Sequence, residues 1–282
     1  MNLSVNETEV KLLLEGIRLR YGYDFRQYAE ASMTRRVESI ARSFAATDLL
    51  ALLRRILDDR SFFLEVLPYL TVTTSEMFRD PLFFKALRED VIPVLRTYPT
   101  FNIWSAGCST GEEIFSLSIL LREEGLSDRA TIYATDINPR AIHSAQDGIY
   151  QVETIKTSIR NYQEAGGKES FSDYYTADYG LAKMNSDLLS NVVFAEHNLV
   201  TDQVFAECHL VLCRNVLIYF NKELQSRVLK LFEDSLRHRG YLCLGSKESL
   251  KFSGSAGAFE TIDEKWRIYR KTAHGLARGF DA

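Results

Sequence analysis

The stretch FNIWSAGCSTGEE (101–113) decides the fold, because a short apolar run ends there in a glycine-containing turn and a helical segment begins. That helical segment continues as EEIFSLSILLREEG (112–125), in which apolar residues recur at helical spacing. A second strand-like run, ATIYATDI (130–137), precedes a second helical segment, NPRAIHSAQDGIY (138–150), with Asn138 as its expected N-cap. This strand–helix–strand–helix order with short connections predicts parallel βαβ units.

The α/β pattern resumes beyond residue 190 and reaches almost to the C-terminus. Its strand-like runs are short and rich in apolar residues, as expected for a sheet that is covered by helices. We predict strands in NVVFAEHNL (191–199), HLVLCRNVL (209–217), YLCLGS (241–246) and DEKWRIYRK (263–271), and a helix over KELQSRVLKLFEDSLRHRG (222–240).

Residues 151–191 interrupt this rhythm. A helix is expected over QVETIKTSIRNYQEA (151–165), and the stretch after it is rich in Tyr, Ser, Asp and Gly. We interpret about residues 166–192 as a small inserted β-subdomain, an antiparallel excursion with a turn near Gly180. The surrounding α/β domain is expected to span residues 91–272, followed by a flexible tail at 273–282 that has no periodic pattern.

The first ninety residues read as a separate helical domain and linker (1–90), because Gly and Pro are scarce and apolar positions recur at helical spacing. Within it, the segment MTRRVESIARSF carries Arg35, Arg36 and Arg42 against one acidic residue, Glu38. This basic face is either solvated, as most such faces are, or a docking surface for an acidic partner helix.

Composition narrows the class of protein. The chain has 34 basic and 38 acidic residues and a net charge of −4, which argues against nucleic-acid binding as its main work. No apolar run is long enough to span a bilayer, and the N-terminus lacks an export-signal pattern. The four cysteines sit in or beside apolar runs, as expected of reduced thiols in a cytoplasmic protein. The five histidines show no metal-ligand spacing, so we predict no metal site.

The glycine turn is the first feature that indicates a ligand. Gly107 and Gly111 allow a tight turn and a close approach of backbone to ligand, but no Gly-Lys-Ser/Thr ending marks a phosphate loop. Glu112 and Glu113 at the helix start would repel phosphate and favour an amine or a sulfonium, which suggests S-adenosylmethionine. A plain strand–helix connection is the alternative.

Two further strand ends face the same edge of the predicted sheet. Asp136 ends the second strand, where an acidic residue accepts ribose hydroxyls in dinucleotide-binding folds, although it could equally cap the next helix. In CRNVLIYF (213–220) the pair Arg214 and Asn215 ends an otherwise apolar strand, and Tyr219 follows. Asn198, in HNL, closes the neighbouring strand and is expected to face the same crevice.

Taken together, WSAGCSTGEE, ATDI, NL, CRNVLIYF and GYLCLGSKESL resemble, in this order, the CheR-type chemoreceptor glutamate methyltransferases. EMFRDP (76–81) and the N-terminal GYDFRQY…MTRRV also resemble that family, and the likeness covers about residues 10–270. The resemblance implies an all-α N-terminal domain and a Rossmann-like S-adenosylmethionine-dependent methyltransferase domain. It further implies methyl transfer to glutamates of a chemoreceptor's cytoplasmic helical bundle, with S-adenosylhomocysteine as product.

The resemblance also assigns roles to individual residues. Arg79 would reach the cofactor from the linker and help catalysis, and Tyr219 would lie near the methyl group and the incoming glutamate. Glu112 would bind the amino group of the methionine part, and Asp136 would hold the ribose. The remaining cofactor contacts are expected from Thr73, Ser75, Gly107, Asn198, Leu199, Asn215 and Val216.

Several positions depart from the family pattern. Where the family often has N-x-T-x-F-F-R, this chain has Thr73, which cannot present an amide, and Ser75, which still offers a hydroxyl. The family's GHSES reads GSKES here, with Ser246 and Lys247, and the usual Asp at the start of the CRNV strand is His209.

A glutamate carboxylate is already ionised at pH 7, so the expected reaction needs no general base. The basic face of Arg35, Arg36 and Arg42 is the candidate docking surface for an acidic receptor bundle, and a monomer is expected. The turn before GLAKMNSDLL is about three residues shorter than in family members that bind a receptor's C-terminal tail, which indicates tail independence. Two alternatives stay open at this point: a non-catalytic cofactor-binding module, and a methyltransferase for another substrate.

Overall fold

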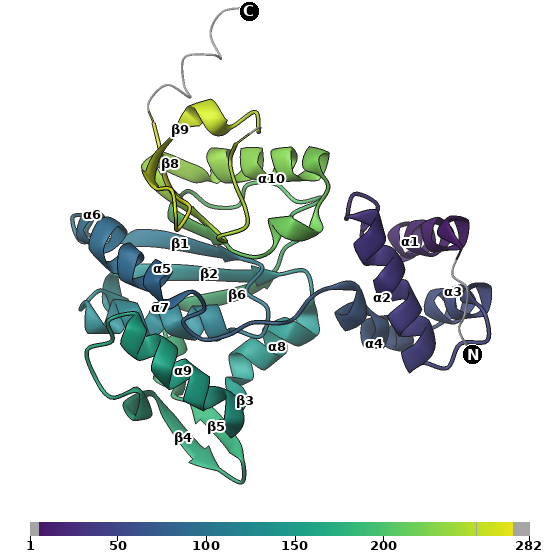
Figure 1. The fold of residues 1–282 in the computed structure, drawn as a ribbon, viewed down its shortest axis with the longest axis horizontal. Coiled ribbons are helices and arrows are strands. Elements are labelled where there is room, and N and C mark those ends of the chain that lie inside the picture. Colours follow the sequence, from purple (N-terminus) through teal and green to yellow (C-terminus); the bar gives the residue numbers. More distant parts are fainter. Residues whose placement is uncertain (1–5, 252, 273–282) are drawn as a thin grey trace, which may run out of the picture.

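Seven strands form a central sheet in the computed structural model, and a bundle of helices lies beside one end of that sheet (Figure 1). The structure describes residues 6–251 and 253–272, so the expected tail at 273–282 lies outside the described residues. The strand order is β6-β2-β1-β7-β8-β10-β9. The bounds are β1 Phe101–Ala106, β2 Ala130–Asp136, β6 Val192–Glu196, β7 Cys208–Cys213, β8 Leu236–Leu244, β9 Phe259–Asp263 and β10 Ile268–Lys271.

The five strands from β6 to β8 run parallel, and β10 pairs antiparallel with both β8 and β9. Alternate residues face opposite sides of the sheet: Ile103 packs into the core on one face and Trp104 into the core on the other. Every residue of β7 is buried, as expected for a strand covered on both faces. The predicted α/β class is therefore confirmed. The helices around the sheet are α5 Pro81–Ala86, α6 Ile92–Leu95, α7 Glu112–Glu123, α8 Pro139–Asp147 and α10 Lys222–Ser235.

The helix predicted over 222–240 ends five residues early, because β8 begins at Leu236 and pairs there with Cys208. The polar sequence RHRG (237–240) does not have the pattern of a strand. The register shift in this pairing shows that the segment enters the sheet irregularly. The last predicted strand is also shorter than expected, since β10 starts only at Ile268.

The inserted part forms a three-stranded antiparallel sheet with the order β3-β5-β4. β4 (Tyr175–Asp178) and β5 (Leu181–Met184) form the expected hairpin about Gly180. β3 (Ile149–Gln151) lies outside the expected range of 166–192 and precedes helix α9 (Val152–Glu164). The sequence predicts Ile149 and Tyr150 at the end of the preceding helix and Gln151 at the start of the next, but the preceding helix ends at Asp147 with Gly148 as its left-handed C-cap.

His209, which replaces the family's usual Asp, sits at the start of β7 on the edge of the sheet away from the strand carboxyl ends. Its Nδ1 accepts a hydrogen bond from the backbone N–H of Asn102 at 3.1 Å, and its Nε2 lies 2.8 Å from Nη1 of Arg237. Burial, together with the charge of Arg237, lowers the pKa of His209. A neutral imidazole has one acceptor nitrogen, so with Nδ1 accepting from Asn102 the ring carries its proton on Nε2.

The N-terminal bundle has a core of its own. Three of its four helices have a side-chain N-cap: Asn6 forms a capping box with Glu9, while Asp48 and Asp59 accept hydrogen bonds from backbone N–H groups of the next turn. The segment after the bundle leads along the sheet edge to α5 (Figure 1). The four helices are α1 Glu7–Tyr21, α2 Glu30–Ser43, α3 Leu49–Asp58 and α4 Arg60–Leu70.

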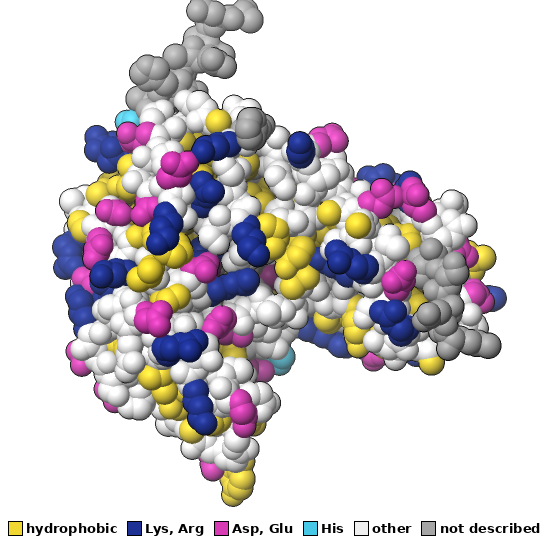
Figure 2. Space-filling view, viewed as in Figure 1, with side chains coloured by type: hydrophobic (Ala, Val, Ile, Leu, Met, Phe, Trp, Pro, Cys, Tyr) yellow, Lys and Arg dark blue, Asp and Glu magenta, His cyan; other side chains and the backbone are white. Residues whose placement is uncertain are grey.

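The surface and the cysteines agree with the composition. Basic and acidic side chains are interspersed over the visible face, without a large area of one sign (Figure 2). All four cysteines are buried and free. Within residues 6–251 and 253–272, none of the helices combines the length and the apolar character that a bilayer crossing requires.

Candidate functional site

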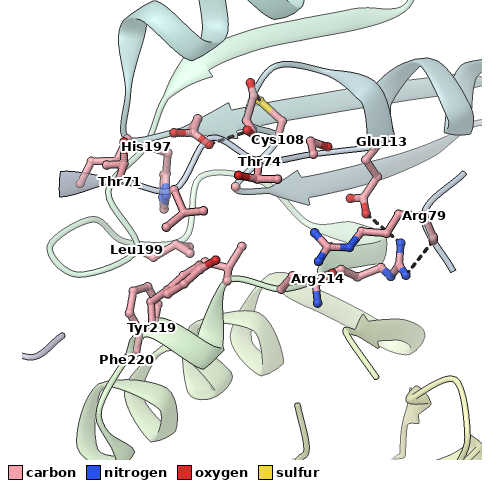
Figure 3. Close-up of a pocket in the computed structure, with 18 of the residues that line it drawn as sticks. Thr71, Thr74, Arg79, Cys108, Glu113, His197, Leu199, Arg214, Tyr219 and Phe220 are labelled. Atoms are coloured by element: carbon pink, nitrogen blue, oxygen red, sulfur yellow. Dashed lines mark hydrogen bonds and ion pairs between the residues drawn. The ribbon is translucent and has the colours of Figure 1, made fainter. Parts of the chain in front are cut away.

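A cavity lies where the carboxyl ends of the central parallel strands meet the linker and the N-terminal bundle. Such a crevice beyond the strand ends is where open α/β sheets bind ligands. Figure 3 shows Tyr219 and Leu199 on one side of it, Cys108 and Thr74 on the opposite side, and Glu113 and Arg79 at one end. Its lining includes nine of the predicted catalytic and cofactor-binding residues, namely Ser75, Arg79, Gly107, Asp136, Asn198, Leu199, Asn215, Val216 and Tyr219.

The glycine turn has to be glycine for a steric reason. Gly107 has φ +82°, and a Cβ there would lie 2.6 Å from a methyl group of Val216. Gly111 has φ +93°, and a Cβ there would lie 2.8 Å from the Cα of Ala145. The turn thus brings bare backbone against the segment after β7 and against helix α8, and leaves the strand ends open to a ligand.

Asp136 faces the cavity and does not cap the next helix, because the N-cap of α8 is Asn138. Its carboxylate accepts hydrogen bonds from the backbone N–H groups of Ser109 and Asn138, each at 2.9 Å. Burial raises the pKa of Asp136, and these backbone hydrogen bonds oppose that shift. A carboxylate has about four acceptor sites, so two remain for ligand hydroxyls.

Four buried polar atoms of the cavity lack a hydrogen-bond partner in the described part of the chain: Ser109 Oγ, His197 Nδ1, Asn215 Oδ1 and Arg214 Nε. Buried polar atoms are rarely left unsatisfied, so these atoms mark where a polar ligand or water would bind. With the free acceptor sites of Asp136, they make a lining that suits a ligand rich in hydroxyl and amino groups, such as an adenosyl amino acid.

Glu112 does not line this cavity, and Glu113 does. Successive helical residues point about 100° apart, so only one of the two glutamates at the start of α7 can face the cavity. Glu113 accepts a hydrogen bond from the Ser105 hydroxyl at 3.0 Å. Glu112 instead bonds to Thr110 at 2.7 Å and faces a neighbouring hollow toward α9, and burial raises its pKa. Of the two glutamates, Glu113 therefore faces this cavity and Glu112 faces the hollow beside it.

Arg214 has a role that the sequence did not reveal. Its guanidinium pairs with Asp80 at 2.7 Å and with Glu113 at 3.3 Å, and donates to the carbonyl oxygen of Arg79 at 3.0 Å. It also lies over the ring of Phe83, 4.0 Å from the centroid. Arg214 thereby fixes the linker against the sheet and so sets where Arg79 enters the cavity. A charged residue at the end of a fully buried strand was the available signal.

Arg36 is also placed differently from the prediction. It is half-buried and lines the cavity, whereas Arg35 and Arg42 are exposed on the same helix. Its guanidinium lies 4.8 Å from the centroid of the Tyr219 ring and donates to the carbonyl oxygen of Leu70. Burial lowers its pKa. No carboxylate pairs with Arg36 in the described ranges 6–251 and 253–272.

The bundle is joined directly to the turn that carries Tyr219. The N–H of Ala29 donates to the carbonyl oxygen of Tyr219, and that of Asn221 donates to Gln27, both at 2.8 Å. The rings of Tyr28 and Phe220 meet edge to face with centroids 4.9 Å apart. The N-terminal bundle therefore closes one side of the cavity. The sequence, which indicates a separate helical domain, did not predict this contact. Thr73 is the remaining predicted contact that does not line it.

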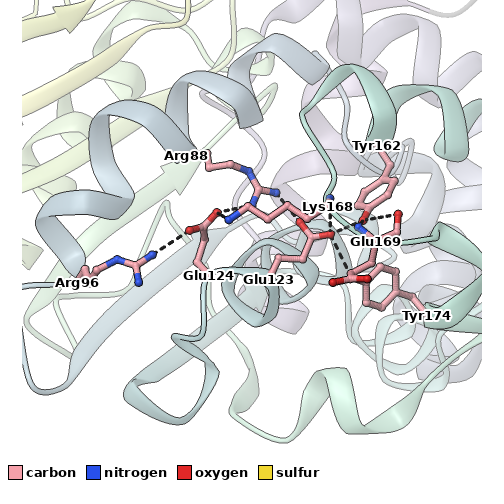
Figure 4. Close-up of polar contacts among 8 residues, drawn as sticks. All are labelled: Arg88, Arg96, Glu123, Glu124, Tyr162, Lys168, Glu169 and Tyr174. Carbon is pink, nitrogen blue, oxygen red and sulfur yellow. Dashed lines mark hydrogen bonds and ion pairs between the residues drawn. The ribbon is translucent and has the colours of Figure 1, made fainter.

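A cluster of charged and phenolic groups at the far end of α7 anchors the inserted subdomain (Figure 4). Glu123 accepts hydrogen bonds from the hydroxyls of Tyr162 and Tyr174, the N–H of Lys168 and the guanidinium of Arg88. Burial alone would raise the pKa of Glu123, but these donors outweigh it and hold the pKa below its ordinary value. The helix that begins at the cavity thus ends at the subdomain. Within the described residues, no group of three or more His, Cys, Asp or Glu side chains could hold a metal ion.

Comparison with known proteins identifies the family. The family described as "CheR methyltransferase, SAM binding domain" matches residues 73–268, and "CheR methyltransferase, all-alpha domain" matches residues 8–71. A Pseudomonas putida protein named as a candidate methyltransferase, Cher3, is 53% identical over 94% of this chain and 97% of its own length. A chemotaxis protein methyltransferase of Vibrio anguillarum is 32% identical over 85% of this chain and 86% of its own. The chain belongs to the CheR methyltransferase family, and S-adenosylmethionine is its cofactor.

Proposed function

We propose that this methyltransferase of the chemotaxis type transfers a methyl group to glutamate side-chain carboxylates of chemoreceptor signalling domains. The bound S-adenosylmethionine supplies the electrophilic methyl group. We further propose that the protein acts as a monomer in the cytoplasm, on the cytoplasmic helical bundle of its receptor. The chemistry of the site itself supports a carboxylate as the methyl acceptor.

The observation that carries the proposal is the Arg36–Tyr219 pair. A partly buried guanidinium without a carboxylate partner in the described part of the chain stands beside a phenol, in the same cavity as Asp136. A desolvated cation is stabilised by an anion brought next to it, and a carboxylate fits a guanidinium with two parallel hydrogen bonds. The pair therefore favours an acceptor that carries a carboxylate.

The site also contains what this reaction needs and little else. A glutamate carboxylate has an ordinary pKa of about 4.3 and is already a nucleophile at neutral pH. The protein's contribution is to orient the two reactants and to exclude water. Tyr219 is placed to donate a hydrogen bond to one carboxylate oxygen, so that the other attacks.

The cofactor would be held by residues from each strand end. We assign its ribose to Asp136, its amino group to Glu113, and its positioning from the linker to Arg79 and Ser75. Asn198 and Leu199 would flank the adenine, and Asn215 and Val216 would lie along the cofactor, as the resemblance implied. Gly107 admits it by leaving the turn without a side chain.

Receptor docking is assigned to the bundle of residues 1–90, through the exposed Arg35 and Arg42. The hairpin of the inserted subdomain supports tail independence, because its turn is only Tyr179–Gly180, with φ of +47° and +79°. Positive φ at both central residues marks a tight two-residue turn, which leaves no loop to receive a receptor tail.

The test is to incubate the protein with methyl-labelled S-adenosylmethionine and a receptor signalling fragment that lacks its C-terminal tail. Base-labile label that maps to glutamate by mass spectrometry is the expected result. Label that appears only with the full-length receptor would contradict tail independence alone. Cofactor binding without label on either receptor would refute the proposed acceptor.

A further inference from the structure

The 3₁₀ turn that carries Tyr219 borders two hollows. Tyr219 lines the cofactor cavity, whereas Leu217 and Ile218 line a second hollow between the start of α10 and the segment after β8. Ile218 is 39% exposed, so an apolar side chain stands at the surface directly beside the active-site tyrosine.

The second hollow carries uncompensated positive charge. Three lysines line it, of which Lys251 is paired with Glu264 at 2.7 Å. Lys222 and Lys247 are exposed and have no ion pair within residues 6–251 and 253–272. One carboxylate lines the hollow, that of Glu248, and it is 4% exposed and occupied by backbone N–H groups.

Stability of the fold does not explain these two lysines. Lys222 is the first residue of α10, directly after the N-cap Asn221, where the helix dipole disfavours a cation by about 0.3–1 kcal/mol. Lys247 stands where the family pattern GHSES has serine, in a chain whose net charge is −4. Lys222 is thus placed against the helix dipole, and both lysines lie in the hollow beside the turn that carries Tyr219.

We propose that this hollow is a docking surface for an acidic stretch of the helix that carries the target glutamate. The inference rests on the proposed function and adds a second contact to it. One helical turn advances about 5.4 Å, so a substrate helix lying over Ile218 would bring carboxylates one or two turns away toward Lys222 and Lys247. The N-terminal bundle grips the opposite side of the same turn through Ala29.

Both surfaces would be positively charged, one through arginines and the other through lysines. Arg35 and Arg42 belong to the bundle, whereas Lys222 and Lys247 belong to the methyltransferase domain. A target helix held from both sides would be fixed in register over Tyr219, which sets which glutamate is methylated. Exposed charges of this kind act on encounter and affinity more than on the chemical step.

The experiment compares wild-type protein with the charge-reversed variant Lys222→Glu/Lys247→Glu, using the tail-less receptor fragment. We expect the KM for the fragment to rise about tenfold at low salt. kcat and the affinity for S-adenosylmethionine, measured by calorimetry, should stay unchanged, which also shows that the variant is folded. The difference in KM should shrink in 0.5 M NaCl, where charges are screened beyond about 4 Å. The neutral variant Lys222→Gln/Lys247→Gln should fall between the two.

The matched control is Lys85→Glu/Lys156→Glu, which changes the net charge equally on the exposed surfaces of α5 and α9. An unchanged KM in the first variant, or an equal rise in the control, would overturn the docking surface. If the wild-type protein methylates no receptor, the proposed function fails and the docking surface fails with it. If the wild-type protein methylates the receptor and the lysine variants have the same KM as the wild type, the docking surface is refuted and the proposed function stands.

Discussion

Replacing Glu248 by glutamine tests whether the active-site turn is held by one buried carboxylate. Oε2 of Glu248 accepts hydrogen bonds from the N–H groups of Gly245 at 2.6 Å and Asn215 at 3.0 Å, and Oε1 accepts from Ile218 at 3.2 Å. A glutamine has one acceptor oxygen, so its NH₂ group must face one of these donors. Leaving one buried N–H unsatisfied costs about 1–3 kcal/mol.

The expected result of Glu248→Gln is a Tm lower by about 4–8 °C, taking 2 kcal/mol and about 2–4 °C per kcal/mol for a chain of this size. Because Asn215 and Tyr219 lie on the held segment, we also expect kcat to fall about tenfold to a hundredfold, as for a reacting group moved by about 1 Å. Thermal unfolding and steady-state methylation of the receptor fragment measure these two quantities.

The control is Glu223→Gln, the same chemical change on the exposed surface of α10, which should alter stability by less than about 0.5 kcal/mol. A Glu248→Gln protein with the Tm and kcat of the wild type would refute the reasoning. A lowered Tm with an unchanged kcat would assign Glu248 to the stability of the fold and leave the position of Tyr219 to other contacts.

Four further predictions follow from the site. Asp136→Ala should weaken binding of S-adenosylmethionine by at least tenfold in calorimetry, and unchanged affinity would refute its ribose role. Tyr219→Phe should lower kcat at nearly unchanged cofactor affinity, while an equal loss of both would contradict its assignment to the acceptor. Glu113→Gln should weaken cofactor binding more than Glu112→Gln, and the reverse order would restore the original assignment. The pKa of His209 is lower in the folded protein, so the unfolded chain binds more protons as the pH falls below about 6.5. The stability that this residue contributes is therefore present above pH 6.5 and is lost as the pH falls through the lowered pKa. Urea unfolding at pH 7.5 and 5.5 should show a smaller loss of stability for His209→Asn than for the wild type.

Much of this site could be predicted from local sequence, because the constraints on it are local. Apolar runs of strand length alternate with helical periodicity, and that order alone requires parallel strands whose carboxyl ends share one edge. Gly107 and Asp136 follow directly from this edge, since a turn without a side chain and a carboxylate at a strand end have the same use wherever the strands lie. The family motifs added the cofactor and the order of the contacts.

The tertiary structure decided which side chains point into the cavity and which point into solvent. Glu112 and Glu113 are equivalent in sequence, and only the orientation of α7 selects Glu113 for the cavity. Arg36 belongs to a basic helical face in sequence, yet the packing of the bundle on the turn of Tyr219 rotates it inward while Arg35 remains in solvent. The physical reason is that composition and periodicity describe only local structure, that is, the type of each element and which of its residues share a face. Burial, pairing and the choice between neighbouring side chains arise only when distant elements pack together.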